Sequence, residues 1–230
     1  MYRLSLRFFL FLGLFMVLTA CVPSSTRDTT VVGAQTLGQR TSFFPQEPGT
    51  LWQYLPEGST LSGLPVVRTV EGPRVVNGER YVMYHSLGRG MDVRSYRQIT
   101  RDGVFLVRQE GPGYVLELSP PIQEYPAPDL LGVGHTWQGS SSARIRFAEA
   151  LNGQNTQTFT TNYSYTVVDK RRVQTNIGQF EVFVINIESQ RLDADGIVTE
   201  TLNQERWFTP YVGDIKTEQD MLLVASNIGN

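Results

Sequence analysis

The sequence predicts an all-β protein whose strands form an antiparallel meander. From residue 50 onward, apolar and polar residues alternate with a period of two, which is the pattern of half-buried strands. Between the alternating segments lie dipeptides that accept the positive φ of tight hairpin turns, namely Asn77-Gly78, Asp102-Gly103 and Asp195-Gly196. No segment has convincing helical periodicity. We therefore expect a duplicated antiparallel meander that forms a strongly curved sheet, a half-barrel or two packed sheets.

The clearest strand covers residues 159–167. Phe159, Tyr163 and Val167 share one face there, and polar residues occupy the other. Residues 180–187 are apolar on both faces, which predicts a central strand covered on both sides. The remaining expected strands are residues 66–70, 80–86, 94–100, 104–109, 114–118, 143–148, 180–190, 198–208 and 221–225.

The two halves of the chain resemble each other. Residues 48–53, Pro-Gly-Thr-Leu-Trp-Gln, parallel residues 134–138, Gly-His-Thr-Trp-Gln, about 85 positions later. Two further matches pair residues 75–82 with 175–182 and, more loosely, 96–107 with 207–215. These matches predict an internal duplication, since self-similarity at a fixed spacing is the signature of repeats. The expected organisation is a first β repeat at 45–120, a proline-rich junction at 121–128 and a second β repeat at 129–230.

The body of the chain resembles a group of bacterial exported proteins and lipoproteins. These carry a Pro-Leu-x-x-Gly-x-x-Trp element, a later Gly-x-(Phe/Tyr)-x-(Val/Cys)-x-x-(Val/Ile) strand and a closing Trp-(Phe/Tyr)-x-Pro-x-Val-Gly-x-(Val/Ile)-Lys element. Here the closing element is residues 207–216, Trp-Phe-Thr-Pro-Tyr-Val-Gly-Asp-Ile-Lys, and the resemblance covers roughly residues 45–220. It implies a curved antiparallel sheet similar to the half-barrels of bacterial lipoprotein carriers, with a concave apolar face.

The first residues have the pattern of an export signal, which we place at residues 1–20. Two arginines precede an apolar run of about ten residues, which is short for a transmembrane helix and typical of a signal peptide. The next four residues, Leu18, Thr19, Ala20 and Cys21, match the lipobox of bacterial lipoproteins, Leu-(Ala/Ser/Thr)-(Gly/Ala)-Cys. This resemblance implies cleavage before Cys21, lipidation of its thiol and anchoring in a membrane. The alternative is an ordinary secretory signal with a cysteine beside its cleavage site by chance.

Residues 21–44 are expected to be the lipidated cysteine and a flexible tether. They are rich in Ser, Thr, Gly and Gln and lack sustained periodicity. A flexible segment of this length has an r.m.s. reach on the order of 25 Å, which would lift the domain off the headgroups. Val22 differs from the aspartate that signals inner-membrane retention in enterobacteria, which favours the outer membrane if the cell has two.

Composition excludes several classes of protein. The chain has 20 basic and 22 acidic residues and a formal net charge of −2, which argues against a nucleic-acid binder. Cys21 is the only cysteine, so no intramolecular disulfide can form. After the N-terminal apolar run, no stretch approaches the ~20 residues that span a bilayer, so we expect a soluble mature domain.

Residues that could perform catalysis are few. His85 and His135 are the only histidines, and we expect both to be surface or structural residues. No HExxH, CxxC, P-loop or Gly-x-Ser-x-Gly motif is present. Residues 193–196, Asp-Ala-Asp-Gly, lack the later glutamate of a calcium loop and predict a hairpin turn, and residues 87–90 predict a loop between strands. We expect no catalytic residue, no metal, no cofactor and no enzymatic activity.

Aromatic residues are the remaining candidates for a binding site. Core packing is the first interpretation, and the alternative is an aromatic-lined cleft that accepts a lipid, a glycan or an apolar segment of a partner. The candidates for such a cleft are Trp52, Trp137, Trp207, Tyr163 and Tyr165.

These observations lead to three hypotheses of function. The first is a non-catalytic envelope lipoprotein, attached to the membrane through Cys21, that presents a β scaffold for protein interaction or envelope maintenance. The second is a carrier or sensor of a lipid or other apolar ligand in the concave sheet. The third is a hydrolytic enzyme, which would require a cleft where His85 or His135 meets a carboxylate.

Overall fold

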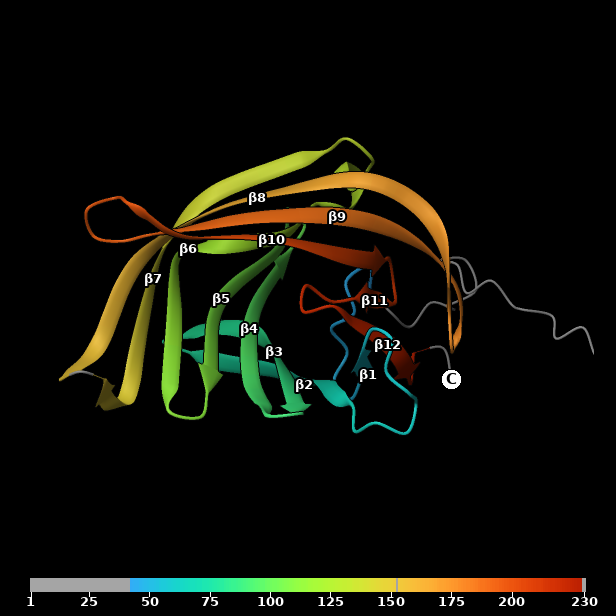
Figure 1. Ribbon diagram of the computed structural model, residues 1–230, viewed down its shortest axis with the longest axis horizontal. Helices are drawn as coiled ribbons and strands as arrows, with labels where there is room; N and C mark the ends of the chain where they lie inside the picture. The colour runs from blue at the N-terminus through green and yellow to red at the C-terminus, as the bar shows by residue number, and fades with distance from the viewer. Residues whose placement is uncertain (1–41, 152, 229–230) are drawn as a thin grey trace, which may run out of the picture.

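The computed structural model describes residues 42–151 and 153–228, which fold into a single antiparallel sheet that closes on itself (Figure 1). Each strand pairs with its neighbours in sequence, and the first strand also pairs with the last. The predicted all-β antiparallel meander is therefore confirmed. The sheet curves until its first and last strands pair, which makes it a closed barrel. Residues 1–20, which include Leu18, Thr19 and Ala20, and Cys21 lie outside the described residues.

The barrel contains twelve strands in the described part of the chain. Each strand expected from the periodicity lies within one of them. Two short strands, β1 and β11, were not expected. The strands are β1 (Leu51–Pro56), β2 (Val66–Val76), β3 (Glu79–Gly88), β4 (Met91–Thr100), β5 (Gly103–Gly111), β6 (Tyr114–Pro126), β7 (Thr136–Leu151), β8 (Gln154–Thr175), β9 (Gly178–Leu192), β10 (Val198–Thr209), β11 (Gly213–Lys216) and β12 (Met221–Ser226), with one 3-10 turn, η1 (Pro128–Leu130), between β6 and β7.

The expected hairpin turns are present. Asn77 and Gly78 join β2 to β3 with φ values of 52° and 84°, the left-handed conformations that this dipeptide favours. Arg89 and Gly90 form the β3–β4 turn, so the loop predicted at residues 87–90 is confirmed in its second half, while Leu87 and Gly88 end β3. In the β9–β10 turn the Asp193 carboxylate accepts hydrogen bonds from the backbone N–H groups of Asp195 and Ile197, so its oxygen stabilises the turn.

The expected proline-rich junction at residues 121–128 needs correction, because residues 121–126 continue strand β6 and only the end of the segment leaves the sheet. Proline has no N–H to donate to a ladder, so it is tolerated where pairing is interrupted. The β5–β6 register shifts between its Leu106–Ile122 and Arg108–Glu117 pairs, and Pro120 lies inside that interruption. The strand therefore passes through the proline pair.

The packed body also begins before residue 45, the boundary expected for the tether. Phe44 is buried in a core cluster with Tyr125 and Phe208. Phe43 packs on the edge of the same cluster, and its carbonyl accepts a hydrogen bond from the N–H of Tyr211. Two adjacent aromatic residues bury enough apolar surface to attach this segment to the barrel.

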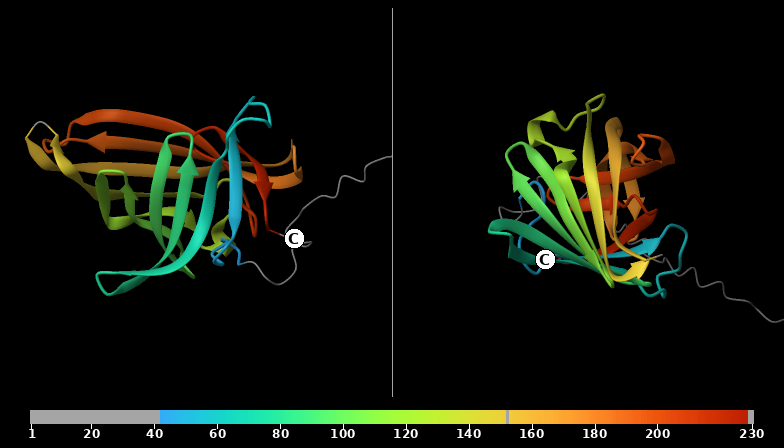
Figure 2. Two further views of the ribbon diagram at one scale, coloured as in Figure 1. Left: turned by 90° about the horizontal axis from the view of Figure 1, so that it is seen from below. Right: turned by 90° about the vertical axis from the view of Figure 1, so that its left-hand side faces the viewer.

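Strands β8, β9 and β10 arch along the long axis over the remaining strands (Figure 1 and Figure 2). Each face of β9 is covered over part of its length, which confirms the prediction around Val184 and Ile185, whereas Glu181 and Asn186 are exposed. Val182 and Val184 belong to the core cluster around Trp52, whereas Ile185 and Ile187 belong to the cluster around Trp137. Within the described ranges no helix has the length and apolarity needed to cross a bilayer.

The two Gly-x-x-Trp elements have the same local geometry. The N–H of Gly49 donates to the carbonyl of Val70, and the N–H of Gly134 donates to that of Val167, at 2.8 and 2.7 Å. Both glycines have positive φ, 87° and 88°, and each precedes the first strand of its half, β1 or β7. This agreement is local, and the duplication of the whole domain stays a prediction.

Candidate ligand site inside the barrel

The closing element of the sequence forms the β10–β11 hairpin and supplies one wall of an interior site. The indole N–H of Trp52 on β1 donates to the carbonyl of Val212 at 2.7 Å, and the hydroxyl of Tyr54 donates to the carbonyl of Asp214 at 3.1 Å. Gly213 has a φ of 99°, and a Cβ there would lie 3.3 Å from the indole nitrogen. Strand β1 therefore holds the hairpin against the barrel interior.

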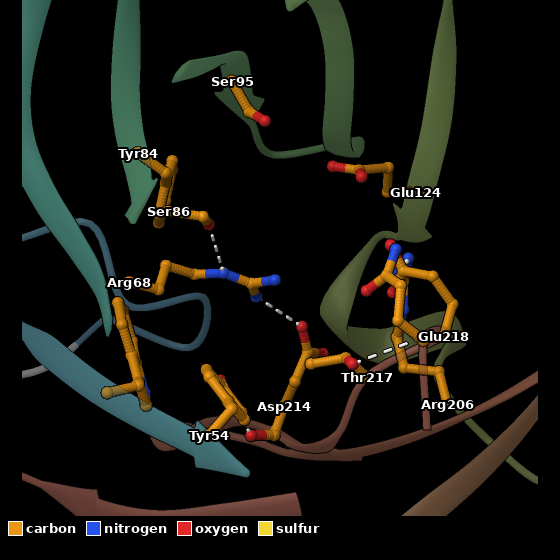
Figure 3. A network of polar contacts seen from close by, with 12 residues as sticks. Tyr54, Arg68, Tyr84, Ser86, Ser95, Glu124, Arg206, Asp214, Thr217 and Glu218 are labelled. Carbon is orange, nitrogen blue, oxygen red and sulfur yellow. Dashed lines mark hydrogen bonds and ion pairs between the residues drawn. The ribbon is translucent and has the colours of Figure 1, made fainter. Parts of the chain in front are cut away.

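Three arginine–carboxylate pairs gather in this interior, and Figure 3 labels all of their residues except Arg97. Figure 3 shows Arg68 extended between Ser86 and Asp214, with Glu124, Arg206 and Glu218 across from it. The pairs and their shortest contacts are Arg68 Nη1 to Asp214 Oδ2 at 2.9 Å, Arg97 Nε to Glu124 Oε2 at 2.5 Å and Arg206 Nη2 to Glu218 Oε2 at 3.2 Å.

Each guanidinium also lies over the face of a tyrosine ring. The distances from the guanidinium carbon to the ring centroid are 5.2 Å for Arg68 and Tyr54, 4.8 Å for Arg97 and Tyr84, and 5.0 Å for Arg206 and Tyr125. The negative face of an aromatic ring attracts a cation, more strongly when water is excluded. The tyrosines therefore help to hold the three side chains in fixed directions.

A cavity of about 50 Å³ lies between these side chains. Strands β1–β6, β10 and β11 all contribute to its wall. This volume is enough for a few water molecules or a small ion. The lining consists of Phe44, Pro45, Trp52, Tyr54, Arg68, Tyr84, Arg97, Val104, Tyr125, Arg206, Phe208, Gly213, Asp214 and Glu218.

The arginines that line the cavity and Glu218 remain charged in this interior. Burial disfavours the charged form of Glu218, but Arg206 and then Arg68 outweigh that effect and hold its pKa at about 2. Burial also opposes the charge of Arg97, yet Glu124 more than offsets it and raises the pKa of the guanidinium. Burial raises the pKa of Tyr125, so this hydroxyl stays protonated and donates to Asp214.

The aromatic residues proposed as binding candidates do not form one cleft. Trp52 alone lines the cavity. Trp137 and Tyr165 are buried and stacked, with ring centroids 5.2 Å apart. The indole N–H of Trp207 donates to Glu205, and the hydroxyl of Tyr163 accepts the backbone N–H of Gln123. The four candidates other than Trp52 therefore pack or form hydrogen bonds within the barrel and do not line the cavity.

The charged residues of the cavity were not singled out by the sequence. One signal was available, because in β10 the period of two places Arg206 on the same face as the buried Phe208. A lone charge on an apolar face requires a partner. The partner of Arg68 is 146 positions away, and local sequence carries no such information.

The two histidines lie elsewhere. Nδ1 of His85 is 2.9 Å from Glu71, and Nε2 is 2.8 Å from Asp92. His85 does meet carboxylates, but it is not among the residues that line the cavity. His135 stacks on Trp137 with centroids 5.8 Å apart. Among the described residues, no group of three or more His, Cys, Asp or Glu could hold a metal ion.

No known family model and no curated protein matches the sequence. Two solved structures are similar. A candidate lipoprotein from Parabacteroides distasonis is 14% identical with a TM-score of 0.48, and a candidate exported protein with a YmcC-like fold from Bacteroides fragilis is 13% identical with a TM-score of 0.47. Each similarity covers 81% of this chain and 99% of the other. Likenesses at this level carry no information about function.

Proposed function

We propose that the chain is a membrane-anchored, non-catalytic lipoprotein of the bacterial cell envelope whose barrel presents a scaffold for protein interaction or envelope maintenance. The observation that carries the proposal is the lipobox, residues 18–21, directly after an apolar run of about ten residues. Two or more acyl chains anchor a protein stably, since each buried methylene contributes ~0.8 kcal/mol. Val22 after the cysteine favours the outer membrane if the cell has two.

The outer surface of strands β7–β10 supports a scaffold role. Two open depressions lie on it, one lined by β7–β9 and one by β8–β10 with the β11–β12 turn. Their linings are mainly Ser, Thr, Asn, Gln and Glu, for example Asn162, Ser164 and Glu188. Many hydrogen-bonding groups on an open surface suit a hydrated, reversible interface with another protein.

No specific observation favours a carrier of lipids. Pockets for drug-sized ligands usually measure about 300–1,000 Å³ and are mostly apolar. The interior cavity measures about 50 Å³ and is lined by three arginines. An acyl chain does not fit this space. Catalysis by His85 is also disfavoured, because both of its ring nitrogens face carboxylates and neither is free for a substrate.

The anchor is tested with Cys21→Ser in the full-length chain, with Ser24→Ala as a matched control that leaves the lipobox intact. We expect the wild type and the control to incorporate labelled palmitate and to stay with membranes after a carbonate wash. Cys21→Ser should remain unlabelled, leave the membranes and keep the circular dichroism spectrum of a folded barrel. Retention of Cys21→Ser on washed membranes contradicts the proposal.

The scaffold is tested by photo-crosslinking in intact cells. A crosslinking amino acid at Glu188 would lie in both depressions, and one at Arg101, which is 93% exposed on the β4–β5 turn, serves as the control. We expect a defined adduct with an envelope protein from position 188 and none from position 101. The absence of a defined adduct at position 188 contradicts a docking role for this surface.

A further inference from the structure

We propose that the interior cavity binds a small oxyanion through one terminal nitrogen from each of Arg68, Arg97 and Arg206. This site is independent of the anchor, and it shares only Glu218 with the outer depressions discussed above.

Each of the three guanidiniums uses only part of its hydrogen-bonding capacity. Arg68 donates from Nε to Ser86 and from Nη1 to Asp214. Arg97 donates from Nε and Nη2 to Glu124. Within residues 42–151 and 153–228, Nη2 of Arg68 and Nη1 of Arg97 form no hydrogen bond. Both side chains line the cavity.

Arg206 supplies the strongest indication of a missing acceptor. Its Nε and Nη2 donate to Glu218, but Nη1 is buried and has no hydrogen-bond partner among the described residues. The residue is only 4% exposed, and its guanidinium lies between the rings of Tyr125 and Tyr165, at 5.0 and 6.0 Å. Buried donors are nearly always satisfied, so an unpaired one in the wall of a cavity indicates an unseen acceptor.

The chemistry of the three donors selects the ligand class. Guanidinium groups match carboxylate, phosphate and sulfate oxygens in both charge and direction. The donors come from β2, β4 and β10, which face one another across the barrel. The cavity of about 50 Å³ admits a small ion and excludes a larger molecule. Access from solvent is possible, since the side chains of Arg68 and Glu218 are 18% and 24% exposed.

The carboxylates of the site determine how binding should depend on charge. Each arginine is already paired with an acid, so the site has little excess positive charge. Recognition must then come from directed N–H groups more than from net charge. We therefore expect an oxyanion with several acceptor oxygens to bind, and chloride at the same ionic strength to bind much more weakly.

Trp52 lines the cavity and provides a direct signal of occupancy. The experiment titrates the full-length lipoprotein, in detergent micelles, with sodium phosphate, sodium sulfate and sodium acetate, using sodium chloride at matched ionic strength as the reference. Intrinsic tryptophan fluorescence and isothermal titration calorimetry are recorded. We expect a saturable response to at least one oxyanion and none to chloride. Acetate alone would identify a carboxylate, and phosphate or sulfate a tetrahedral ion.

The matched variants are Arg206→Lys, which keeps a cation beside Glu218 but removes Nη1, and Arg101→Lys, a surface control that is 93% exposed. Arg206→Lys should weaken oxyanion binding at least tenfold, and Arg101→Lys should leave it unchanged. Sulfate and phosphate also stabilise proteins by exclusion from the surface, but that effect is not saturable.

A wild type without a saturable response to any oxyanion overturns the proposal, and the three ion pairs are then purely structural. The same holds if Arg206→Lys folds and binds as tightly as the wild type. If Arg206→Lys does not fold, Arg97→Lys gives the same comparison, and the titration of the wild type with oxyanion against chloride still decides. None of these outcomes depends on whether Cys21 is lipidated.

Discussion

At the scale of single residues, the barrel interior is stabilised by matching each buried guanidinium to one carboxylate. A buried ion pair gains little over apolar packing, but the removal of one partner leaves an uncompensated charge. Arg97 and Glu124 illustrate this. The Glu124 side chain is only 6% exposed, and both of its carboxylate oxygens accept hydrogen bonds from the Arg97 guanidinium. The three pairs join β2 to β11, β4 to β6, and β10 to the β11–β12 turn.

Glu218→Gln tests this pairing through pH. The pKa of Glu218 is lowered from 4.5 to about 2, so its contribution to stability is complete above pH 4.5 and disappears as the pH falls towards 2. In the variant, the free energy of unfolding should decrease by about 2 to 3 kcal/mol at neutral pH, because Arg206 loses its partner. The variant should also lose less stability than the wild type between pH 4.5 and 2.

Urea unfolding at a series of pH values measures both effects. Glu149→Gln, at an exposed position on β7, is the matched control and should follow the wild type at every pH. Parallel pH profiles for Glu218→Gln and the wild type would show that the Glu218–Arg206 pair contributes nothing to stability.

The alternation of apolar and polar residues in the sequence predicted which residues pack in the core. It did not predict the ion pairs, because these join strands that are far apart in the sequence. Val182, Val184, Ile185 and Ile187 could be assigned to a doubly covered strand, because six of the eight residues 180–187 are apolar and they occupy both even and odd positions. The pairing of Arg68 with Asp214 depends on closure of the barrel, and a period of two carries no information about which distant strands meet.

At the scale of elements, strand β9 connects the two core clusters. Most strands of the barrel present one apolar face, whereas β9 buries Val184 on one side and Ile185 on the other. The elements that sequence reasoning missed, β1 and β11, have six and four residues, too few to show sustained alternation. Their positions depend on the partners that they join, chiefly through Trp52 and the carbonyl of Val212.

Two adjacent substitutions test the double burial of β9. Val184→Ala and Ile185→Ala should each lower the free energy of unfolding by roughly 2 to 4 kcal/mol, because each deletes methyl groups from a packed cluster. In an ordinary half-buried strand, only one of two neighbouring positions would show such a loss. Val168→Ala on β8, where the side chain is 43% exposed, should cost less than about 0.5 kcal/mol.

Chemical denaturation measured by circular dichroism compares the three variants. A near-neutral effect at either Val184 or Ile185 would mean that one face of β9 is open to solvent, and the two-cluster core would then be wrong.

At the scale of the whole molecule, the ends of the described chain meet where β1 pairs with β12. This seam joins residues that are 165 to 174 positions apart, for example Gln53 and Ala225. A closed sheet has no free edge on which another strand can add. The ring also brings β10 and β11 against β2 and β4, and so it assembles the interior cavity.

A disulfide across the seam tests this closure. Gln53 and Ala225 are directly paired, so the double variant Gln53→Cys, Ala225→Cys should crosslink on oxidation in a Cys21→Ser background, which contains no other thiol. The bond closes a very long loop and should raise the free energy of unfolding by about 2 to 4 kcal/mol, mainly by restricting the unfolded chain.

The control pair, Gln53→Cys with Thr199→Cys, lies on distant strands and should not crosslink. Thiol titration and thermal unfolding with and without reductant measure the outcome. Failure of the first pair to crosslink while the barrel remains folded would mean that β1 and β12 are apart and that the sheet is open.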